Sequence, residues 1–299
     1  MSHSVGVVWH PLCQAHDPGA GHPESPARIT TILDELRASA QRITWVEAKP
    51  ATDAELLRVH SSDYLEALRR RSEQGGGYLD ADTFMSPHSL AAATRAAGAA
   101  VEAVRMTLDG TNTYSAVRPP GHHACRGRAT GFCLFNNVVV GVRAALEELE
   151  LRRVLIVDWD VHHGNGTQEL VERDDRIRYV SLHQFPHYPG TGAESETGVG
   201  NIFNVPRPPG LPRETYVDDL NEAVTAATDR WTPDLVFISA GFDAMAGDPL
   251  GGFTLEPEDY RNMAAEWARQ WPVAAILEGG YKPARIARAS VAVIEALGA

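Results

Sequence analysis

Apolar residues recur at the spacing of an amphipathic helix in three segments of the chain. Two of these segments begin with a Ser-Pro pair, which is typical of an N-cap followed by the first helical position. The pattern predicts helices that begin after Ser25 and after Ser86, the second ending at Gly110, and a third helix within residues 136–150. In the first helix the expected buried face consists of Ile29, Ile32, Leu33 and Leu36.

Four other segments are short, continuously apolar and rich in β-branched residues. They cover residues 113–117, 154–157, 235–239 and 273–277. Runs of this kind are typical of strands buried on both faces, as in parallel sheets covered by helices. Together with the helices between them, they predict an α/β protein with one central, mostly parallel sheet and helices on both faces.

The chain of 299 residues shows no internal repeat, no low-complexity segment and no convincing linker. The stretch rich in Pro and Gly at residues 204–214 is better interpreted as a long surface loop than as a domain boundary. We therefore predict a single domain over residues 1–299.

The formal net charge of −12 provides no basic surface to follow a phosphate backbone, which argues against nucleic acid as a direct partner. No apolar run is long enough to span a bilayer, and the first residues lack the features of a signal peptide. The three cysteines form no C-x-x-C pair, so neither a disulfide framework nor a four-cysteine zinc site is expected. These features predict a soluble, cytoplasmic protein without a membrane partner, and they leave its oligomeric state open.

Each of the four apolar runs leads directly into a polar or glycine-rich sequence. In chain order these sequences are "RPPGHHA", "DWDVHHGNG", "AGFDAMAGDP" and "LEGGY". In open parallel sheets, ligands bind beyond the carboxyl ends of the strands. We therefore expect side chains from these four distant segments to meet in one active site at that edge of the sheet.

The segment "DWDVHHGN" has the pattern of a metal site. Asp158, Asp160 and His162 are two residues apart, so they share one side of an extended chain. Carboxylate and imidazole ligands together suit zinc or a similar divalent metal, and Asp243 is the natural third ligand. Such a set leaves one coordination position open, which is typical of a catalytic metal. A lone Asp-x-His pattern is usually a surface or capping arrangement, and the convergence of four strand ends is what favours the metal site.

Two carboxylate ligands neutralise a divalent ion and weaken its effect on bound water, so a separate general base is expected. The adjacent His122 and His123 could supply it. Asp158 could orient one imidazole and Asn165 the other, and the neutral Asn165 would raise the pKa of its partner less than a carboxylate would. Tyr281, which follows two glycines, could donate its hydroxyl to the oxyanion formed when water attacks an acyl carbon.

The same segments carry a resemblance to a known family. "RPPGHHA", "GFCLFNN", "DWDVHHGNG", "SLHQFPHYPGTG", "AGFDAMAGDPLGG" and "LEGGY" occur in the order and approximate spacing of the zinc-dependent histone deacetylase superfamily. "HPESPARI" and Asn165, where class I members have Asp, resemble class II members and the bacterial histone deacetylase-like amidohydrolases, relatives of the acetylpolyamine amidohydrolases. The resemblance runs from about residue 10 to residue 281 and implies the arginase/deacetylase α/β fold.

The resemblance also implies one zinc ion per chain, held by Asp160, His162 and Asp243. In the family, the second histidine of the tandem pair is usually taken as general base and then general acid. That role falls on His123, and the role of electrostatic partner falls on His122.

The transition-state tyrosine of the family falls on Tyr281, which some class II members replace by His, so its retention favours real deacetylase activity. Family members also bind a potassium ion beside the zinc. Its implied ligands here are Asp158, Asp160, His162, Ser181 and the carbonyl of Leu182.

A narrow substrate tunnel is a further implication of the resemblance. Phe132 and Tyr188 would form its walls, Gly131 part of its floor and Leu250 its rim, and Asp82 could be the rim carboxylate that holds substrate N–H groups. Where the tunnel usually has a second Phe, this chain has a Tyr whose hydroxyl could contact substrate or reach solvent. The buried end of an acylated lysine is uncharged, so an aromatic slot can hold its methylene groups without desolvating an ammonium.

The remaining His and Cys residues have simpler interpretations. We expect structural roles for His163, His183 and His187, and packing near the site for Cys125 and Cys133. The remaining residues are Cys13, His16 and His22. They could bind an accessory metal, but chance placement in surface loops is the favoured interpretation.

The leading predicted function is zinc-dependent hydrolysis of an acylated amine, such as acetyl-lysine or a small acyl amide. Acetylpolyamine hydrolysis is an alternative, although the apolar Leu250 argues against the acidic residue that a polyamine enzyme would place near the tunnel mouth. Arginase or agmatinase chemistry requires two metals bridged by further aspartates, where this chain has Gly164 and Phe242. A non-catalytic acyl-amine sensor would keep the pocket without turnover, yet the full catalytic set is present.

Overall fold

A parallel sheet of eight strands forms the centre of the structure, a computed structural model that describes residues 3–299. The strand order is β2-β1-β5-β10-β9-β6-β7-β8, and all neighbouring pairs in it are parallel. The strands are β1 Val5–Trp9, β2 Ile43–Glu47, β5 Thr113–Ala116, β6 Val154–Asp158, β7 Ile177–Gln184, β8 Ile202–Arg207, β9 Leu235–Ala240 and β10 Val273–Leu277. A small antiparallel pair lies apart from this sheet and consists of β3 Gly77–Tyr78 and β4 Phe84–Met85.

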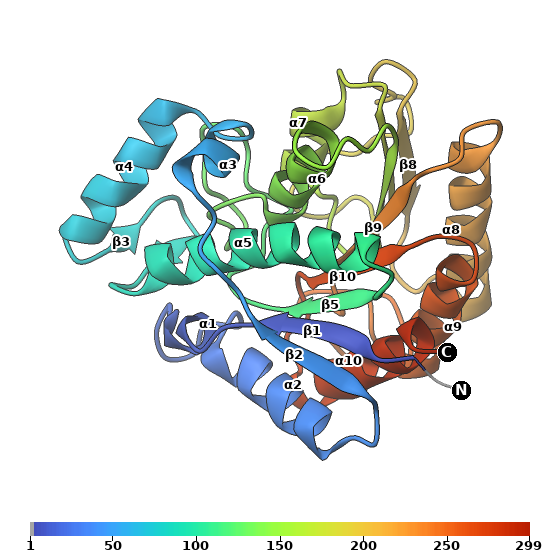
Figure 1. The fold of residues 1–299 in the computed structure, drawn as a ribbon, viewed down its shortest axis with the longest axis horizontal. Coiled ribbons are helices and arrows are strands. Elements are labelled where there is room, and N and C mark those ends of the chain that lie inside the picture. Colours follow the sequence, from blue (N-terminus) through green and yellow to red (C-terminus); the bar gives the residue numbers. More distant parts are fainter. Residues whose placement is uncertain (1–2) are drawn as a thin grey trace.

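Helices cover both faces of the sheet (Figure 1). Helices α2, α8, α9 and α10 contribute to one apolar core, and α3 to α7 contribute to the core on the opposite face. The helices are α1 Leu12–Ala15, α2 Pro26–Ala38, α3 Asp53–Leu57, α4 Ser62–Glu73, α5 Ser89–Leu108, α6 Asn137–Glu147, α7 Asn165–Val171, α8 Arg213–Thr228, α9 Pro257–Ala268 and α10 Pro283–Leu297. The predicted α/β fold, with a parallel sheet between two helical layers, is confirmed.

The central strands are continuously apolar because each strand supplies both cores. In β6, Leu155 and Val157 pack into one core, while Val154 and Ile156 pack into the other. All four side chains are fully buried. Successive side chains of a strand point to opposite faces, so burial on both faces removes the polar alternation of a surface strand.

The predicted strands and helices agree with the structure except at some boundaries. The first helix buries the predicted face, and the four predicted strands all lie in the sheet. The second helix, α5, begins at Ser89, so the prediction that it starts directly after Ser86 was wrong. A turn in which the N–H of Ser89 bonds the carbonyl of Ser86 precedes the helix instead.

Four strands of the sheet were not predicted, and they are β1, β2, β7 and β8. The interpretation of residues 204–214 as one surface loop was wrong at both ends, because residues 204–207 belong to β8 and α8 begins at Arg213. Proline cannot donate a backbone hydrogen bond, but β8 is an edge strand, where Pro206 is tolerated.

The topology brings five strand ends together at one edge of the sheet. The strands β5, β10, β9, β6 and β7 are consecutive neighbours. Four of them lead into the motifs that predicted the site, and "SLHQFPHYPGTG" begins within the fifth, β7. The first and last described parts of the chain also lie close together, since the N–H of His3 bonds the carbonyl of Gly298 at 2.8 Å (Figure 1). The predicted domain over residues 1–299 includes residues 1 and 2, which lie outside the described residues. Within residues 3–299, no helix combines the length and apolar character needed to cross a membrane.

Candidate active site

Asp160, His162 and Asp243 form the only group of His, Cys, Asp or Glu side chains in residues 3–299 that could hold a metal ion. Their ligand atoms lie within 4.8 Å of one another, and all three residues are buried. Asp160 and His162 follow the end of β6, and Asp243 follows the end of β9, so the pairing of these strands brings them together. The Asp160 carboxylate accepts the backbone N–H of His162 at 2.9 Å, which fixes its direction.

The surroundings of these three side chains fit a divalent cation. Oδ2 of Asp243 is buried and has no hydrogen-bond partner in the described part of the chain. Burial disfavours a charged imidazole, yet the neighbouring carboxylates of Asp160 and Asp243 raise the pKa of His162 to about 10, so the group attracts positive charge. A Cβ on Gly241 would lie 2.1 Å from Oδ2 of Asp160, so glycine is required for this close approach. Two carboxylates and one imidazole are a donor set that suits zinc.

The tandem histidines follow β5 and have unequal partners. Nδ1 of His122 lies 3.1 Å from the Asp158 carboxylate, and Nδ1 of His123 lies 2.7 Å from the side-chain oxygen of Asn165. Burial opposes a charged His122, but the carboxylates of Asp160 and Asp158 raise its pKa to about 10. Burial and the neighbouring charge of His122 hold the pKa of His123 well below its usual value. These surroundings favour the charged form of His122 and the neutral form of His123.

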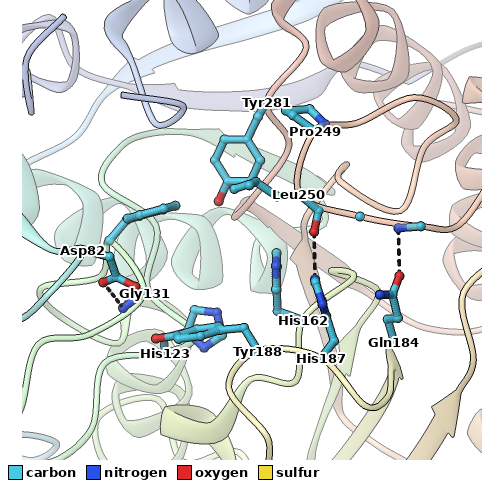
Figure 2. A pocket seen from close by; sticks show the side chains of 13 residues that line it. Asp82, His123, Gly131, His162, Gln184, His187, Tyr188, Pro249, Leu250 and Tyr281 are labelled. Carbon is cyan, nitrogen blue, oxygen red and sulfur yellow. Dashed lines mark hydrogen bonds between the residues drawn. The ribbon is translucent and has the colours of Figure 1, made fainter. Parts of the chain in front are cut away.

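A cavity of about 430 Å³ lies next to the ligand group. His123, His162 and Tyr281 all line it, as Figure 2 shows. The five residues predicted to bind substrate also line this cavity, and they are Asp82, Gly131, Phe132, Tyr188 and Leu250. His122 is absent from the lining, so the two histidines differ in their access to a ligand as well as in their partners.

Gly131 and Phe132 form a wall that comes close to His123. A Cβ on Gly131 would lie 2.3 Å from Cδ2 of His123. The φ angles of Gly131 and Phe132 are both positive, at 57° and 67°. Asp82 holds this segment, because its Oδ1 accepts the N–H of Gly131 at 3.2 Å. Thr83 accepts the N–H of Phe132 at 3.0 Å. The structure thus places Asp82 at the cavity with one oxygen engaged by the chain itself.

Tyr188 also lines the cavity and is 39% exposed. Its ring lies edge-on to His123, with 5.1 Å between the ring centroids. Its hydroxyl lies 2.9 Å from the Thr130 hydroxyl, so it makes a hydrogen bond within the protein. The sequence did not predict this contact, and contact of the hydroxyl with substrate or solvent stays a prediction.

Tyr281 follows β10 and faces the cavity. Its ring contacts Phe132 edge-on, with 5.9 Å between centroids, and the Arg28 guanidinium lies 5.0 Å from the ring centre. Burial and the Asp243 carboxylate raise the pKa of Tyr281 well above its usual value. Its hydroxyl therefore stays protonated and able to donate.

The residues predicted to bind potassium lie on the neighbouring strands β6 and β7 or directly after the end of β6. Asp158 and Ser181 are direct partners in the register of these strands, and Leu182 is the next residue of β7. The hydroxyl of Tyr179, which sequence reasoning missed, donates to Oδ2 of Asp158 at 2.9 Å. The Ser181 hydroxyl lies 3.0 Å from Nδ1 of His183. The arrangement brings these residues together, and potassium binding stays a prediction.

The other histidines of the region have structural contacts, as predicted. His163 lies between Thr191 and Gln168, at 2.8 and 2.9 Å. His183 bonds the carbonyl of Gly192 at 3.0 Å. His187 stacks on His162, a candidate metal ligand, with 5.1 Å between ring centroids.

The cysteines are all free and buried. Cys133 donates to the carbonyl of Gly131 at 3.2 Å, and Cys125 lies 3.6 Å from the Asn165 amide, so the predicted packing near the site is confirmed.

The residues considered for an accessory metal do not form a metal-binding group, and the surface-loop alternative was also wrong for two of them. Cys13 is fully buried, and the buried His16 bonds Ser89 and contacts Glu24 at 2.7 and 3.2 Å. His22 packs edge-on against Phe132 with 4.7 Å between ring centroids.

Glu278 is a site residue that sequence reasoning missed. It is fully buried directly after β10, and its Oε2 accepts the N–H groups of Gly121 and His122 at 2.6 and 3.1 Å. Burial raises its pKa to about 7. The available signal was an acidic residue directly after a buried strand, within the same "LEGGY" segment that predicted Tyr281.

A buried ionic network behind Tyr281 was also missed. Glu24 is fully buried and accepts from Arg28 at 2.8 Å and from Arg118 at 2.5 Å. Arg28 in turn donates to the carbonyl of Gly280 at 2.5 Å, and Gly280 directly precedes the candidate catalytic residue Tyr281. The signal was the pair of basic residues in apolar surroundings, one of them within the first predicted helix.

Comparison with known proteins gives a consistent result. The histone deacetylase domain family matches residues 22–297. A histone deacetylase-like amidohydrolase of Pseudomonas aeruginosa is 40% identical over 93% of this chain and 77% of its own length. A probable deacetylase of Methanothermobacter thermautotrophicus is 38% identical over 97% of this chain and 90% of its own length. The crystal structure of the HDA15 HD domain superposes with a TM-score of 0.94 at 36% identity, covering 99% of this chain and 88% of that one.

Proposed function

The chain belongs to the histone deacetylase family, and from this premise we propose that it hydrolyses the amide bond of an acylated amine with one zinc ion held by Asp160, His162 and Asp243. One observation carries the proposal. His162 of the candidate metal-binding group, the neutral His123 and the protonated Tyr281 all line the same cavity. In the reaction, water adds to the acyl carbon, the bond from carbon to nitrogen breaks, and a carboxylate and an amine leave.

Zinc bound at this site would polarise the acyl oxygen and the attacking water. His123 accepts the proton of that water at Nε2, because its Nδ1 is engaged by Asn165. The same nitrogen then gives the proton to the leaving amine. Tyr281 donates its hydroxyl to the oxygen that becomes negative as water attacks. His122 stays charged beside Asp158 and stabilises the negative charge that develops nearby.

We propose an acylated lysine as the substrate class. The end of such a side chain is a neutral amide, which suits a cavity walled by Phe132, Tyr188 and Leu250. Acetylpolyamine is the second candidate, because the Asp82 carboxylate lines the same cavity and could attract a cationic amine. Within residues 3–299, only one group of His, Cys, Asp or Glu side chains could hold a metal ion. A single metal site favours this reaction over ureohydrolase chemistry, which requires two metals.

The test compares hydrolysis of an acetyl-lysine peptide, acetylputrescine and trifluoroacetyl-lysine by the zinc-loaded protein, followed by mass spectrometry. We expect the fastest turnover on a lysine substrate, a loss of about 100-fold or more in kcat for Tyr281→Phe, and no loss for Tyr78→Phe, an exposed tyrosine outside the cavity. Full activity of Tyr281→Phe would overturn the mechanism. Tight binding of an acetylated ligand that is recovered uncleaved would show a sensor instead.

A further inference from the structure

Asp248 connects two parts of the site that come from different strand ends. It is buried, 7% exposed, in the loop that follows β9. Its Oδ1 accepts the N–H of Leu250 at 2.9 Å, and its Oδ2 accepts the N–H of Tyr281 at 2.7 Å. One carboxylate therefore holds both the apolar rim of the cavity and the backbone of the tyrosine that follows β10.

The peptide group between Gly280 and Tyr281 is held on both sides. Arg28 donates to its carbonyl oxygen at 2.5 Å, and Asp248 accepts from its N–H at 2.7 Å. Hydrogen bonds with charged groups are shorter and stronger than those between neutral groups. Gly280 has a φ of 112°, a conformation open to glycine, so the segment itself gives little resistance to rotation. The Arg28 guanidinium and the Asp248 carboxyl group together fix this peptide plane, and the plane sets the direction of the Tyr281 side chain.

The rim is held by two further side chains, both from the residues that end or follow β7. His187 donates to the carbonyl of Leu250 at 2.9 Å, and Gln184 accepts the N–H of Gly252 at 2.7 Å (Figure 2). The rim segment is thus tied to the strand end that carries Tyr188. Asp248 is the side chain that ties the same rim segment to Tyr281.

We propose that Asp248 is a positioning residue. It directs the Tyr281 hydroxyl into the cavity and holds the Leu250 rim at a fixed position relative to Tyr281. The inference rests on the proposed function for its effect on turnover, but the placement of Tyr281 can be measured without turnover. Misplacing a reacting group by about 1 Å can reduce the rate about 100-fold. Loss of the carboxylate should therefore lower kcat through Tyr281 and raise KM through the rim.

Asp248→Asn keeps the shape of the side chain and replaces one acceptor oxygen by an amide NH2, which faces an N–H group. We expect kcat to fall about 10- to 100-fold and KM to rise a few-fold. The control is Asp234→Asn, because Asp234 also accepts two backbone N–H groups, those of Arg152 and Arg153 at 2.8 and 2.9 Å, both on its Oδ2 and outside the cavity lining. The control should keep its turnover.

A double variant separates positioning from general destabilisation. If Asp248 acts on kcat through Tyr281, Asp248→Asn should change kcat by less than about twofold when added to Tyr281→Phe. An equal loss of kcat in both backgrounds would overturn the proposal. Asp248→Ser, which keeps a single small acceptor, is the second variant, and it should show the same dependence on Tyr281.

Fluorine NMR of protein labelled with 3-fluorotyrosine tests the placement directly. The signal that disappears in Tyr281→Phe identifies Tyr281. We expect this signal to shift or broaden in Asp248→Asn and to stay in place in Asp234→Asn. An unchanged Tyr281 signal would overturn the positioning role even in a protein that hydrolyses no acyl amide, whereas a lack of all hydrolysis with a shifted signal would overturn only the proposed function.

Discussion

Nδ1 of His123 lies 2.7 Å from the side-chain oxygen of Asn165, a neutral partner for a buried histidine. Burial and the charge of His122 together hold the pKa of His123 well below its usual value. A neutral imidazole is the form that can accept a proton, so this pairing keeps the proposed base ready at neutral pH. The neighbouring His122, whose partner is the carboxylate of Asp158, is held in the charged form.

Asn165→Asp should reverse part of this inequality. A carboxylate at the same place would favour the charged imidazole and raise the pKa of His123 by about one unit or more. Because the base must be neutral, the acid limb of the profile of kcat/KM against pH should move to higher pH, and activity on the acid side should fall. The measurement is that profile for both proteins. An acid limb that stays in place would show that His123 is not the group that titrates.

Removal of the metal should abolish turnover and weaken the fold. Asp160 and Asp243 are both fully buried, and a bound cation compensates their charges. Dialysis against a chelator should stop hydrolysis, zinc should restore it, and the free energy of unfolding should fall by about 4 kcal/mol if zinc had been present at about 1,000 times its Kd. Elemental analysis should give one zinc per chain and much less in Asp243→Asn. Two manganese ions per chain, with release of urea from a guanidino substrate, would contradict the proposed function.

Those parts of the candidate site that depend only on residue type and spacing could be predicted from the sequence. Asp160 and His162 are two residues apart at the end of a continuously apolar strand, and Asp243 follows another such strand. A local sequence pattern is sufficient to predict these ligands, because the residues that follow parallel strands lie at the same edge of the sheet. The adjacent histidines were predictable for the same reason.

The carboxylates that hold the loops could not be predicted in this way. Glu278 accepts N–H groups from residues more than 150 positions away, and Asp248 accepts one from Tyr281, 33 positions away. Backbone N–H groups are present at nearly every residue, so no side-chain pattern marks which of them a distant carboxylate will accept. The strand β2 was missed because it is an edge strand of the sheet, is only partly buried and lacks a continuous apolar run.

The contact between Tyr188 and Thr130 should affect substrate binding modestly. Their hydroxyls lie 2.9 Å apart at an exposed position beside the cavity. A hydrogen bond of this kind contributes about 0.5–1.5 kcal/mol, so Tyr188→Phe and Thr130→Val should each raise KM about 2- to 10-fold. The double variant should be no worse than either single variant, because both changes remove the same bond. Steady-state kinetics of the four proteins checks this, and effects that multiply would refute it.

Glu24→Gln should strongly destabilise the fold. The substitution leaves the buried guanidinium groups of Arg28 and Arg118 without their shared carboxylate. Breaking a buried ion pair by removing one partner costs about 3–5 kcal/mol. The matched control is Glu66→Gln, which removes an exposed ion pair with Arg70 and should cost less than about 1 kcal/mol. Urea unfolding of both variants measures the difference, and equal losses would show that the buried network is not stabilising.

His60 should make the fold sensitive to acid. Its Nδ1 donates to the carbonyl of Cys125 at 3.0 Å, and its Nε2 accepts the N–H of Asn136 at 3.0 Å, so both nitrogens are occupied in the neutral form. Burial lowers the pKa of His60 from 6.5 to about 4. The folded state then binds fewer protons than the unfolded state between these values, so this contribution to stability is complete above the unfolded pKa and is lost as the pH falls toward 4. From pH 7 to pH 5, the wild type should lose about 2 kcal/mol more unfolding free energy than His60→Gln. Urea unfolding at the two pH values gives both differences, and equal losses in the two proteins would show that His60 does not couple folding to protonation.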